Sequence, residues 1–232
     1  MKRSIINNYI SEAQDFLAGK QFKLPPFAYW TADEWKSKGR EYDEIRNNQL
    51  GWDLTDFGRG DYEKTGLLLF TIRNGNYNDP HGKPYAEKIL IVKPGQLTPY
   101  HFHKAKMEDI INRGNGTLNI QVYCSLDDKT LDMESDVPVS VDGRNYKVKA
   151  GTVVVLKTGE SITLYQKIFH QFWSDDAMLL IGEVSKVNDD HNDNFFNGEI
   201  SRFPDIDEDE KPLRLLLGDY EKYWPVSSPC IN

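Results

Sequence analysis

A succession of short apolar segments between about residues 66 and 187 constrains the fold of this chain more than any other feature. The segments span residues 66–73, 88–93, 117–124, 146–149, 152–156, 161–165, 169–173 and 178–187. Turn signals such as Asn74-Gly75 and Asp142-Gly143 separate them. Many short strands at this spacing are typical of a β-sandwich or barrel, so we predict an all-β region from about residue 51 onward.

The first 50 residues have a different pattern. Apolar side chains fall at helical spacing up to Gly19, which supplies a stop. Thr31 and Glu34 have the spacing of a capping box that opens a second helix, and a third helix is expected near residues 41–46. Because no internal repeat or long linker appears, we predict a single domain. It comprises a helical extension over about 1–50, a barrel over about 51–187 and a C-terminal extension over about 188–232.

Charge and composition narrow the class of partner. The chain has 232 residues, with 36 acidic and 28 basic side chains and a net charge of −8. No dense Lys/Arg cluster indicates nucleic-acid binding, and no apolar run has the length of a membrane span. The N-terminus lacks a signal-peptide core, and two cysteines are too few for a disulfide framework. We therefore expect a cytoplasmic protein with free thiols, of which Cys124 should be buried.

A pair of histidines predicts a metal site. His101 and His103 are two residues apart, so on a strand both imidazoles face the same side. A turn over residues 104–107 would return Glu108 to the neighbouring strand, and His170 is the candidate for a third histidine. Imidazoles and a carboxylate with open positions suit Mn, Fe, Co, Ni or Zn. The alternative is an exposed histidine pair with His170 as an ordinary core residue.

The spacing Gly95-x5-His101-x-His103-x4-Glu108 resembles the first sequence motif of the cupins. This resemblance implies a double-stranded β-helix, the jelly-roll barrel of that family. The closing glycine of the motif is displaced, because Asn115 stands where it is expected.

The second cupin motif is matched less completely. Gly159 and His170 fit it, whereas Tyr165 and Lys167 stand at the positions of its proline and inner glycine. The resemblance therefore implies four metal ligands. The assignment of His170 as a ligand is supported by fewer matching residues than the assignments of the other three.

Three segments, residues 86–95, 101–112 and 182–190, resemble the cupin-type D-lyxose isomerases. The likeness implies a Mn²⁺-dependent homodimeric enzyme that interconverts D-lyxose and D-xylulose, and also D-mannose and D-fructose. Two alternatives use the same barrel: an Fe(II)-dependent cupin dioxygenase and a non-catalytic sugar-binding cupin.

Aldose–ketose isomerisation moves a proton between C1 and C2 and requires a positioned base. Glu183 shares strand parity with apolar neighbours, so we expect it to face inward, with a pKa raised by desolvation, and to act as the base. Lys88 and Lys106 are expected to stabilise the enediolate oxygens or to relay the second proton. The alternatives are a mutual Lys88–Glu183 ion pair and a solvated Lys106.

Residues 189–194 carry polar side chains suited to sugar hydroxyls. From this segment we expect Asp190 and Asp193, together with Gln166, to bind substrate. The alternative is a surface loop.

Overall fold

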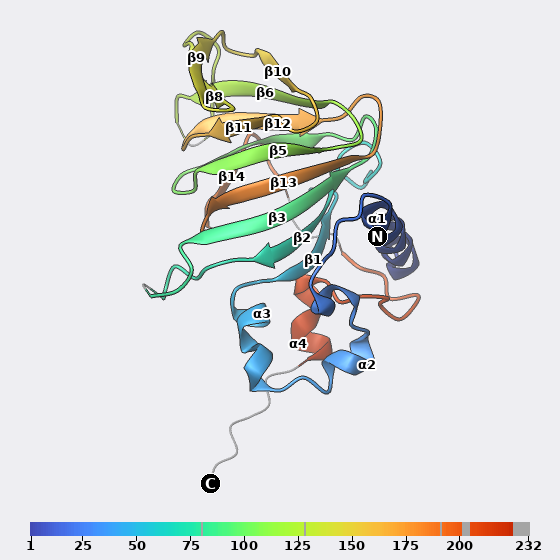
Figure 1. Cartoon of the computed structure of the whole chain (residues 1–232). Helices are drawn as coiled ribbons and strands as arrows, with labels where there is room; N and C mark the ends of the chain where they lie inside the picture. The colour runs from blue at the N-terminus through green and yellow to red at the C-terminus, as the bar shows by residue number, and fades with distance from the viewer. Residues whose placement is uncertain (80, 128, 191, 201–204, 225–232) are drawn as a thin grey trace.

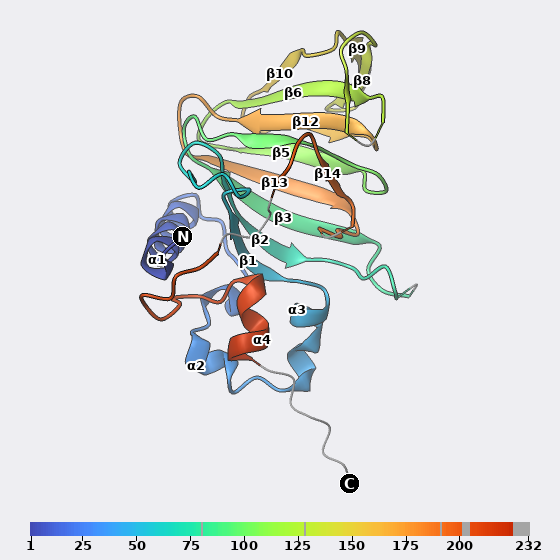
Figure 2. The ribbon, with the colours of Figure 1, turned by 180° about the vertical axis from the view of Figure 1, so that it is seen from behind.

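Two curled antiparallel sheets face one another and enclose the core (Figures 1 and 2). The computed structural model describes residues 1–79, 81–127, 129–190, 192–200 and 205–224. The larger sheet runs, from edge to edge, β1 (Gly51–Thr55), β2 (Leu67–Arg73), β3 (Tyr85–Val92), β13 (Leu179–Lys186), β5 (Glu108–Gly114), β11 (Ser161–Leu164), β8 (Val137–Val141) and β9 (Arg144–Val148). The smaller runs β10 (Val153–Leu156), β6 (Leu118–Ser125), β12 (Ile168–Trp173), β4 (Thr98–His103) and β14 (Asn194–Phe196), with β7 (Leu131–Asp132) paired to β6. The prediction of an all-β cupin barrel is confirmed.

Alternation along the strands directs apolar side chains into the space between the sheets. Leu90, Ile110 and Ile181 from the larger sheet meet Ile120 and Phe172 from the smaller one, and all five are buried. Strand β13 pairs with β3 on one side and β5 on the other, so its inward residues lie at the centre of the larger sheet.

The predicted N-terminal helix forms α1 (Arg3–Gly19). Its apolar stripe packs on the outer face of the larger sheet, where Ile10 and Leu17 join a buried cluster with Trp52 and Phe70. The helix therefore covers part of the barrel from outside.

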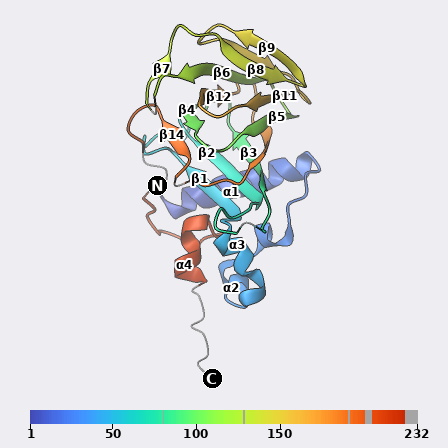
Figure 3. The same ribbon diagram turned by 90° about the vertical axis from the view of Figure 1, so that its left-hand side faces the viewer.

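The remaining helices are short and lie together on one side of the barrel (Figure 3). They are η1 (Pro26–Tyr29), α2 (Ala32–Trp35), η2 (Arg40–Tyr42), α3 (Asp43–Asn47), η3 (Leu217–Asp219) and α4 (Tyr220–Tyr223). The predicted capping box opens α2, since the Thr31 N–H donates to Glu34 Oε2 at 2.8 Å and the Glu34 N–H donates to Thr31 Oγ1 at 3.2 Å. Trp35, Tyr220 and Trp224 pack together beneath the barrel.

The segment after residue 187 contributes a strand that its sequence does not indicate. Strand β14 pairs with β4, with Asn194 opposite His103 and Phe196 opposite His101. A three-residue strand has too little alternation to be recognised, and its pairing with β4 is a tertiary contact.

Cys124 is half-buried, so the expectation of a buried thiol is wrong, while Cys230 lies outside the described residues. No helix in the described part of the chain has both the length and the apolar character needed to cross a membrane.

Candidate active site

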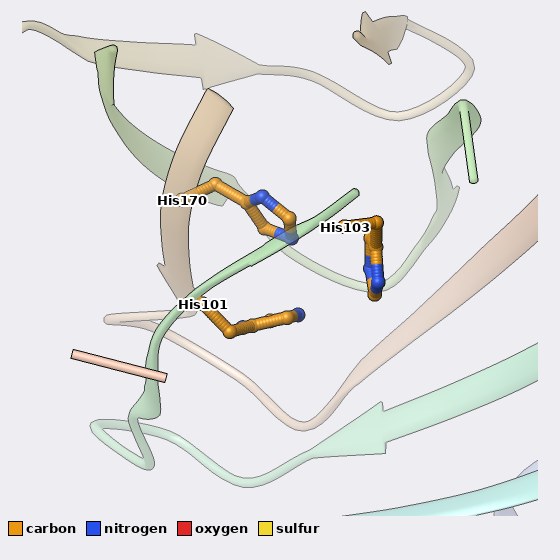
Figure 4. A group of neighbouring side chains, drawn as sticks. All are labelled: His101, His103 and His170. Atoms are coloured by element: carbon orange, nitrogen blue, oxygen red, sulfur yellow. The ribbon is translucent and has the colours of Figure 1, made fainter. Parts of the chain in front are cut away.

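The histidines predicted to bind a metal come together inside the barrel (Figure 4). His101 and His103 lie on β4, and His170 of β12 is directly opposite His101. The ligand nitrogens of the three side chains all lie within 4.8 Å of one another. The structure therefore supports His170 as a member of the group, although its sequence motif is incomplete.

Backbone carbonyls orient all three imidazoles. Nδ1 of His101 lies 2.9 Å from the Pro99 carbonyl oxygen, and Nδ1 of His170 lies 3.1 Å from that of Ile168. Nδ1 of His103 lies 3.1 Å from the Asp193 carbonyl oxygen. A carbonyl oxygen only accepts hydrogen bonds, so each neutral ring carries its hydrogen on Nδ1 and leaves the lone pair on Nε2.

Two of the three free nitrogens are buried and lack a hydrogen-bond partner among the described residues. These are Nε2 of His103 and Nε2 of His170. Burial lowers the pKa of His101 and His103, which favours the neutral, ligating form of each ring. Buried lone pairs directed at one space are what a divalent cation needs, so these residues fit a metal site.

Glu108 begins β5, across the turn from β4, and faces the same space. Its Oε1 lies 3.2 Å from Nε2 of His170 and 3.4 Å from Nε2 of His103. Burial alone would raise the pKa of Glu108, but the positive charge of Lys106 holds it well below its usual value. The carboxylate is therefore ionised and adjoins the three histidines.

Lys106 joins this group to the expected base. Its Nζ lies 2.7 Å from Oε2 of Glu108 and 2.8 Å from Oε1 of Glu183, and it donates to Asn188 at 3.3 Å. The alternative of a solvated lysine is wrong, because the Lys106 side chain is 3 % exposed. Burial would lower the pKa of Lys106, but the two carboxylates raise it, so the amine stays protonated.

Glu183 faces inward as its strand parity predicts, but its expected pKa shift is wrong. Burial raises the pKa of Glu183, yet Lys106 and Lys88 together lower it below the usual glutamate value. Ser185 also donates a hydrogen bond to Glu183 Oε1 at 3.0 Å. The carboxylate is therefore ionised at neutral pH, which is the form that can accept a proton.

Lys88 is opposite Glu183 on the neighbouring strand β3 and also lines the cavity. Its Nζ lies 3.5 Å from Oδ1 of Asp190, so an ion pair holds it toward the segment after β13. Lys88 therefore contributes positive charge beside Glu183 while pairing with a different carboxylate.

Two of the expected substrate-binding residues hold a loop instead of lining the cavity. The Asp193 carboxylate accepts backbone N–H groups of Lys104, Ala105 and Lys106 at 2.9, 2.7 and 2.8 Å. Gln166 donates to the Ala105 carbonyl oxygen at 3.1 Å. These contacts position the turn that carries Lys106. Of the expected sugar-binding segment, Asp190 lines the cavity and residue 191 lies outside the described residues.

Asn194, the last residue of the expected sugar-binding segment, also lines the cavity, together with Thr98 and Phe196, which the sequence did not single out. Between the Thr98–Phe172 and His101–His170 pairs, two residues of β4 lie opposite one residue of β12, and this extra residue turns both Thr98 and His101 inward. Thr98 Oγ1 and Asn194 Oδ1 are buried without a hydrogen-bond partner among the described residues. A bulge and a tertiary strand pairing create these positions, so strand parity alone could not identify them.

Comparison with known proteins agrees with this geometry. The family model "D-lyxose isomerase" matches residues 1–220. A "D-lyxose/D-mannose isomerase" of Serratia proteamaculans is 42% identical over 227 residues, covering 96% of this chain and 99% of the relative. One of Escherichia coli O157:H7 is 40% identical over 227 residues, covering 96% and 100%. This chain belongs to the D-lyxose isomerase family. Family membership makes it a sugar isomerase and decides against the dioxygenase and the non-catalytic cupin.

Solved structures of other isomerases share the fold of this D-lyxose isomerase family member. The L-ribose isomerase of Cellulomonas parahominis with L-ribose has a TM-score of 0.57 at 17% identity, with 89% of this chain and 98% of that chain covered. A variant L-ribose isomerase of Acinetobacter sp. DL28 in complex with L-ribose has a TM-score of 0.59 at 15% identity, with the same coverage. At this level of sequence identity, the similarity shows a shared fold and nothing more about the site.

Proposed function

We propose that this protein is a metal-dependent aldose–ketose isomerase that interconverts D-lyxose with D-xylulose and D-mannose with D-fructose. Two relatives at 40 and 42% identity that cover nearly the whole chain carry the name D-lyxose/D-mannose isomerase. The observation that carries the chemistry is the continuous polar group in the cavity, in which Lys106 lies between Glu108 and Glu183 beside three histidines.

The proposed metal ligands are His101, His103, Glu108 and His170, and the proposed ion is Mn²⁺. Nitrogen and carboxylate ligands suit several divalent metals, so the choice of manganese rests on the family resemblance. When bound, the ion would act as a Lewis acid that polarises the C1 and C2 oxygens of an open-chain sugar.

Glu183 is the proposed base. In its ionised form it would take the proton from C2 of the aldose and return it to C1, which completes the transfer through an enediol. The protonated Lys106 amine lies 2.8 Å from Glu183 Oε1, so it is placed to donate to an enediolate oxygen. Lys88 adds a second positive charge, and Asp190, which lines the cavity, remains a proposed contact for sugar hydroxyls.

The test is anaerobic conversion of D-lyxose and D-mannose by protein stripped with a chelator and then supplied with single divalent metals. Chromatography should show ketose only after metal addition, with Mn²⁺ the most effective. Solvent deuterium should appear in the product. Ketose formation unaffected by chelation would contradict the metal assignment, and no aldose conversion with any metal would contradict the proposed function. Complete absence of deuterium would indicate either a proton that is shielded from solvent exchange or a metal-assisted hydride shift.

A further inference from the structure

The cavity beside the histidines is small for the substrates of the proposed function. Its volume is about 50 Å³. Sites for small organic ligands usually span about 300 Å³ or more. With C1 and C2 held near His101, His103 and His170, the far end of a five- or six-carbon chain must therefore extend elsewhere.

A second, larger cavity shares one lining residue, Asp190, with the first. Its volume is about 330 Å³, and it lies between the end of α3 and the η3–α4 segment. Arg46, Gln49, Leu217 and Tyr220 contribute to its walls, and Asp190 lines both cavities. An extended sugar chain that leaves the first cavity past Asp190 would reach this second space.

Arg46 is held in place at the second cavity. Its guanidinium carbon lies 4.0 Å from the centre of the Trp224 ring, and its side chain lies 3.6 Å from the Asp43 carboxylate. Nε of Arg46 is buried and has no hydrogen-bond partner among the described residues. A guanidinium held in place at the wall of a cavity is suited to donate hydrogen bonds to a hydroxyl oxygen of a ligand there.

Gln49 offers a second polar group at the same place. Its backbone has a φ of 54°, and its side-chain amide makes no hydrogen bond within the described part of the chain. An amide both donates and accepts, so it can pair with a hydroxyl group in either sense. By contrast, the Tyr220 hydroxyl is occupied, because it donates to the Leu50 carbonyl oxygen at 2.7 Å.

We propose that the second cavity is the subsite for the distal hydroxyls of the sugar, and that Arg46 and Gln49 set the preference between six-carbon and five-carbon substrates. The inference rests on the proposed function and adds the subsite to it. D-lyxose and D-mannose have the same configuration at C2, C3 and C4, and D-mannose is longer by one hydroxylated carbon. The two sugars are therefore a matched pair for testing contacts beyond C5.

The test is the ratio of kcat/KM for D-mannose to kcat/KM for D-lyxose in the Mn²⁺-loaded full-length protein. Gln49→Gly removes the amide, and glycine accepts the left-handed backbone at this position. Loss of one hydrogen bond should lower the ratio about 3- to 10-fold, and Arg46→Leu should lower it about 10-fold or more.

Arg40→Leu is the matched control. Arg40 also lies 3.6 Å from Asp43, but its side chain is 80% exposed and it does not line the cavity. It should leave the ratio unchanged. An unchanged ratio in Gln49→Gly and Arg46→Leu, or an equal fall for both sugars, would overturn the subsite.

A binding measurement separates this inference from the proposed function. D-mannitol and D-arabinitol carry the chains of the two sugars without a carbonyl group. Calorimetry should show that Gln49→Gly weakens D-mannitol binding about 3- to 10-fold and leaves D-arabinitol binding nearly unchanged. If this result is obtained with a protein that shows no isomerase activity, the subsite stands and the proposed isomerisation is rejected. If the protein is an active isomerase but each variant binds D-mannitol and D-arabinitol as the wild type does, the subsite is rejected.

Discussion

Each histidine of the site has one ring nitrogen committed to a backbone carbonyl, and this contact decides which nitrogen can bind a metal. The backbone itself is also specialised here. Gly95, before β4, has a φ of 71°, and Lys167, before β12, has a φ of 61°. Lys167 therefore keeps the left-handed conformation at the position where the cupin motif has glycine, and its N–H donates to the His103 carbonyl oxygen at 2.9 Å.

At the residue scale, His103→Ala should remove bound metal and activity while leaving the barrel folded. The substitution deletes one converging Nε2 and leaves the carbonyl oxygen of Asp193, its Nδ1 partner, free to bind water. Elemental analysis and circular dichroism are the measurements. His81→Ala, at an exposed loop histidine, should keep metal content and activity. Full metal content in His103→Ala would rule out this ligand.

Glu183→Gln should keep metal and sugar binding and lower kcat by at least about 100-fold, the usual lower range for removal of a general base. The amide preserves the shape of the side chain but cannot take a proton. Steady-state kinetics with D-lyxose measures the loss. Glu87→Gln, on the opposite face of the same sheet and 3.2 Å from Arg73, is the matched control and should leave turnover unchanged. Near-normal turnover in Glu183→Gln would transfer the role of base to another residue.

At the scale of elements, one buried ion-pair group ties α1 to the C-terminal segment. The Arg3 side chain is 0% exposed and donates to Asp219 at 2.7 and 2.9 Å and to Glu208 at 2.9 Å. Asp219 in turn accepts the Leu216 N–H at 2.9 Å, which holds the start of η3. The N-terminal helix and the last helical turn are thereby joined across more than two hundred residues of sequence.

Arg3→Met should lower the free energy of unfolding by about 3–5 kcal/mol, because it leaves the buried Asp219 carboxylate without its cation. Urea denaturation measures this change. Lys36→Met breaks an exposed ion pair with Asp33, whose atoms are 2.7 Å apart, and should leave the free energy of unfolding nearly unchanged because solvent screens this pair. Equal, small effects of the two substitutions would show that the Arg3 group does not stabilise the fold.

The same group predicts a pH dependence. Hydrogen bonds from Arg3 lower the pKa of Glu208 in the folded chain. A lowered folded-state pKa stabilises the protein above the unfolded glutamate value of about 4.3, and this contribution is lost as the pH falls through the folded value. Glu208→Gln should therefore lower the melting temperature at pH 7, and the difference from wild type should shrink below about pH 4.3. A difference that grows in acid would contradict this sign.

A second link between elements supports the position of Lys106. Asn74, at the end of β2, accepts the Asn188 N–H at 2.9 Å and donates to the Asn188 carbonyl oxygen at 2.9 Å. It also donates to the Asn48 carbonyl oxygen at 3.1 Å. The Asn188 side chain, held in this way, accepts a hydrogen bond from Lys106. The end of α3 and the segment after β13 therefore both help to position Lys106 in the active site.

At the scale of the whole molecule, the expected ligands come from both sheets. His101, His103 and His170 belong to the smaller sheet, whereas Glu108 belongs to the larger one. A metal ion bound by all four would connect the two halves of the barrel.

Metal loading should therefore raise the melting temperature. Mass action at a metal concentration of about 1,000 times Kd stabilises the native state by about 4 kcal/mol, which for a chain of this size is on the order of 10 °C. Thermal denaturation with Mn²⁺ and with excess chelator is the measurement, and His103→Ala should show little response. Identical melting curves for the wild type with and without metal would contradict a shared site.

The chain is expected to form a homodimer, as its family resemblance implies. The apolar face of α1 and the ring of Trp224 are already buried within the chain, so a dimer would use other surfaces. Light scattering at micromolar concentration should give twice the mass of the chain. The mass of a monomer would contradict the expected homodimer.

Local periodicity in the sequence was enough to predict several features of the fold and the site. The positions of His101 and His103 on one face, the turn that returns Glu108, the inward direction of Glu183 and the helix α1 all follow from spacing along a few residues. These features can be predicted because the geometry of a strand or a helix fixes the directions in which neighbouring side chains point.

The way these parts meet depends on contacts between distant segments of the chain. The tertiary structure paired Lys106 with both Glu108 and Glu183, and this pairing reversed the pKa shift expected for Glu183. It also turned the Asp193 carboxylate to the backbone of the Lys106 loop and placed β14 beside β4. Lys106 and Glu183 are 77 positions apart, and Lys106 and Asp193 are 87 apart, so these contacts leave no local periodicity in the sequence. The balance between burial and charge depends on which groups folding brings within a few ångströms.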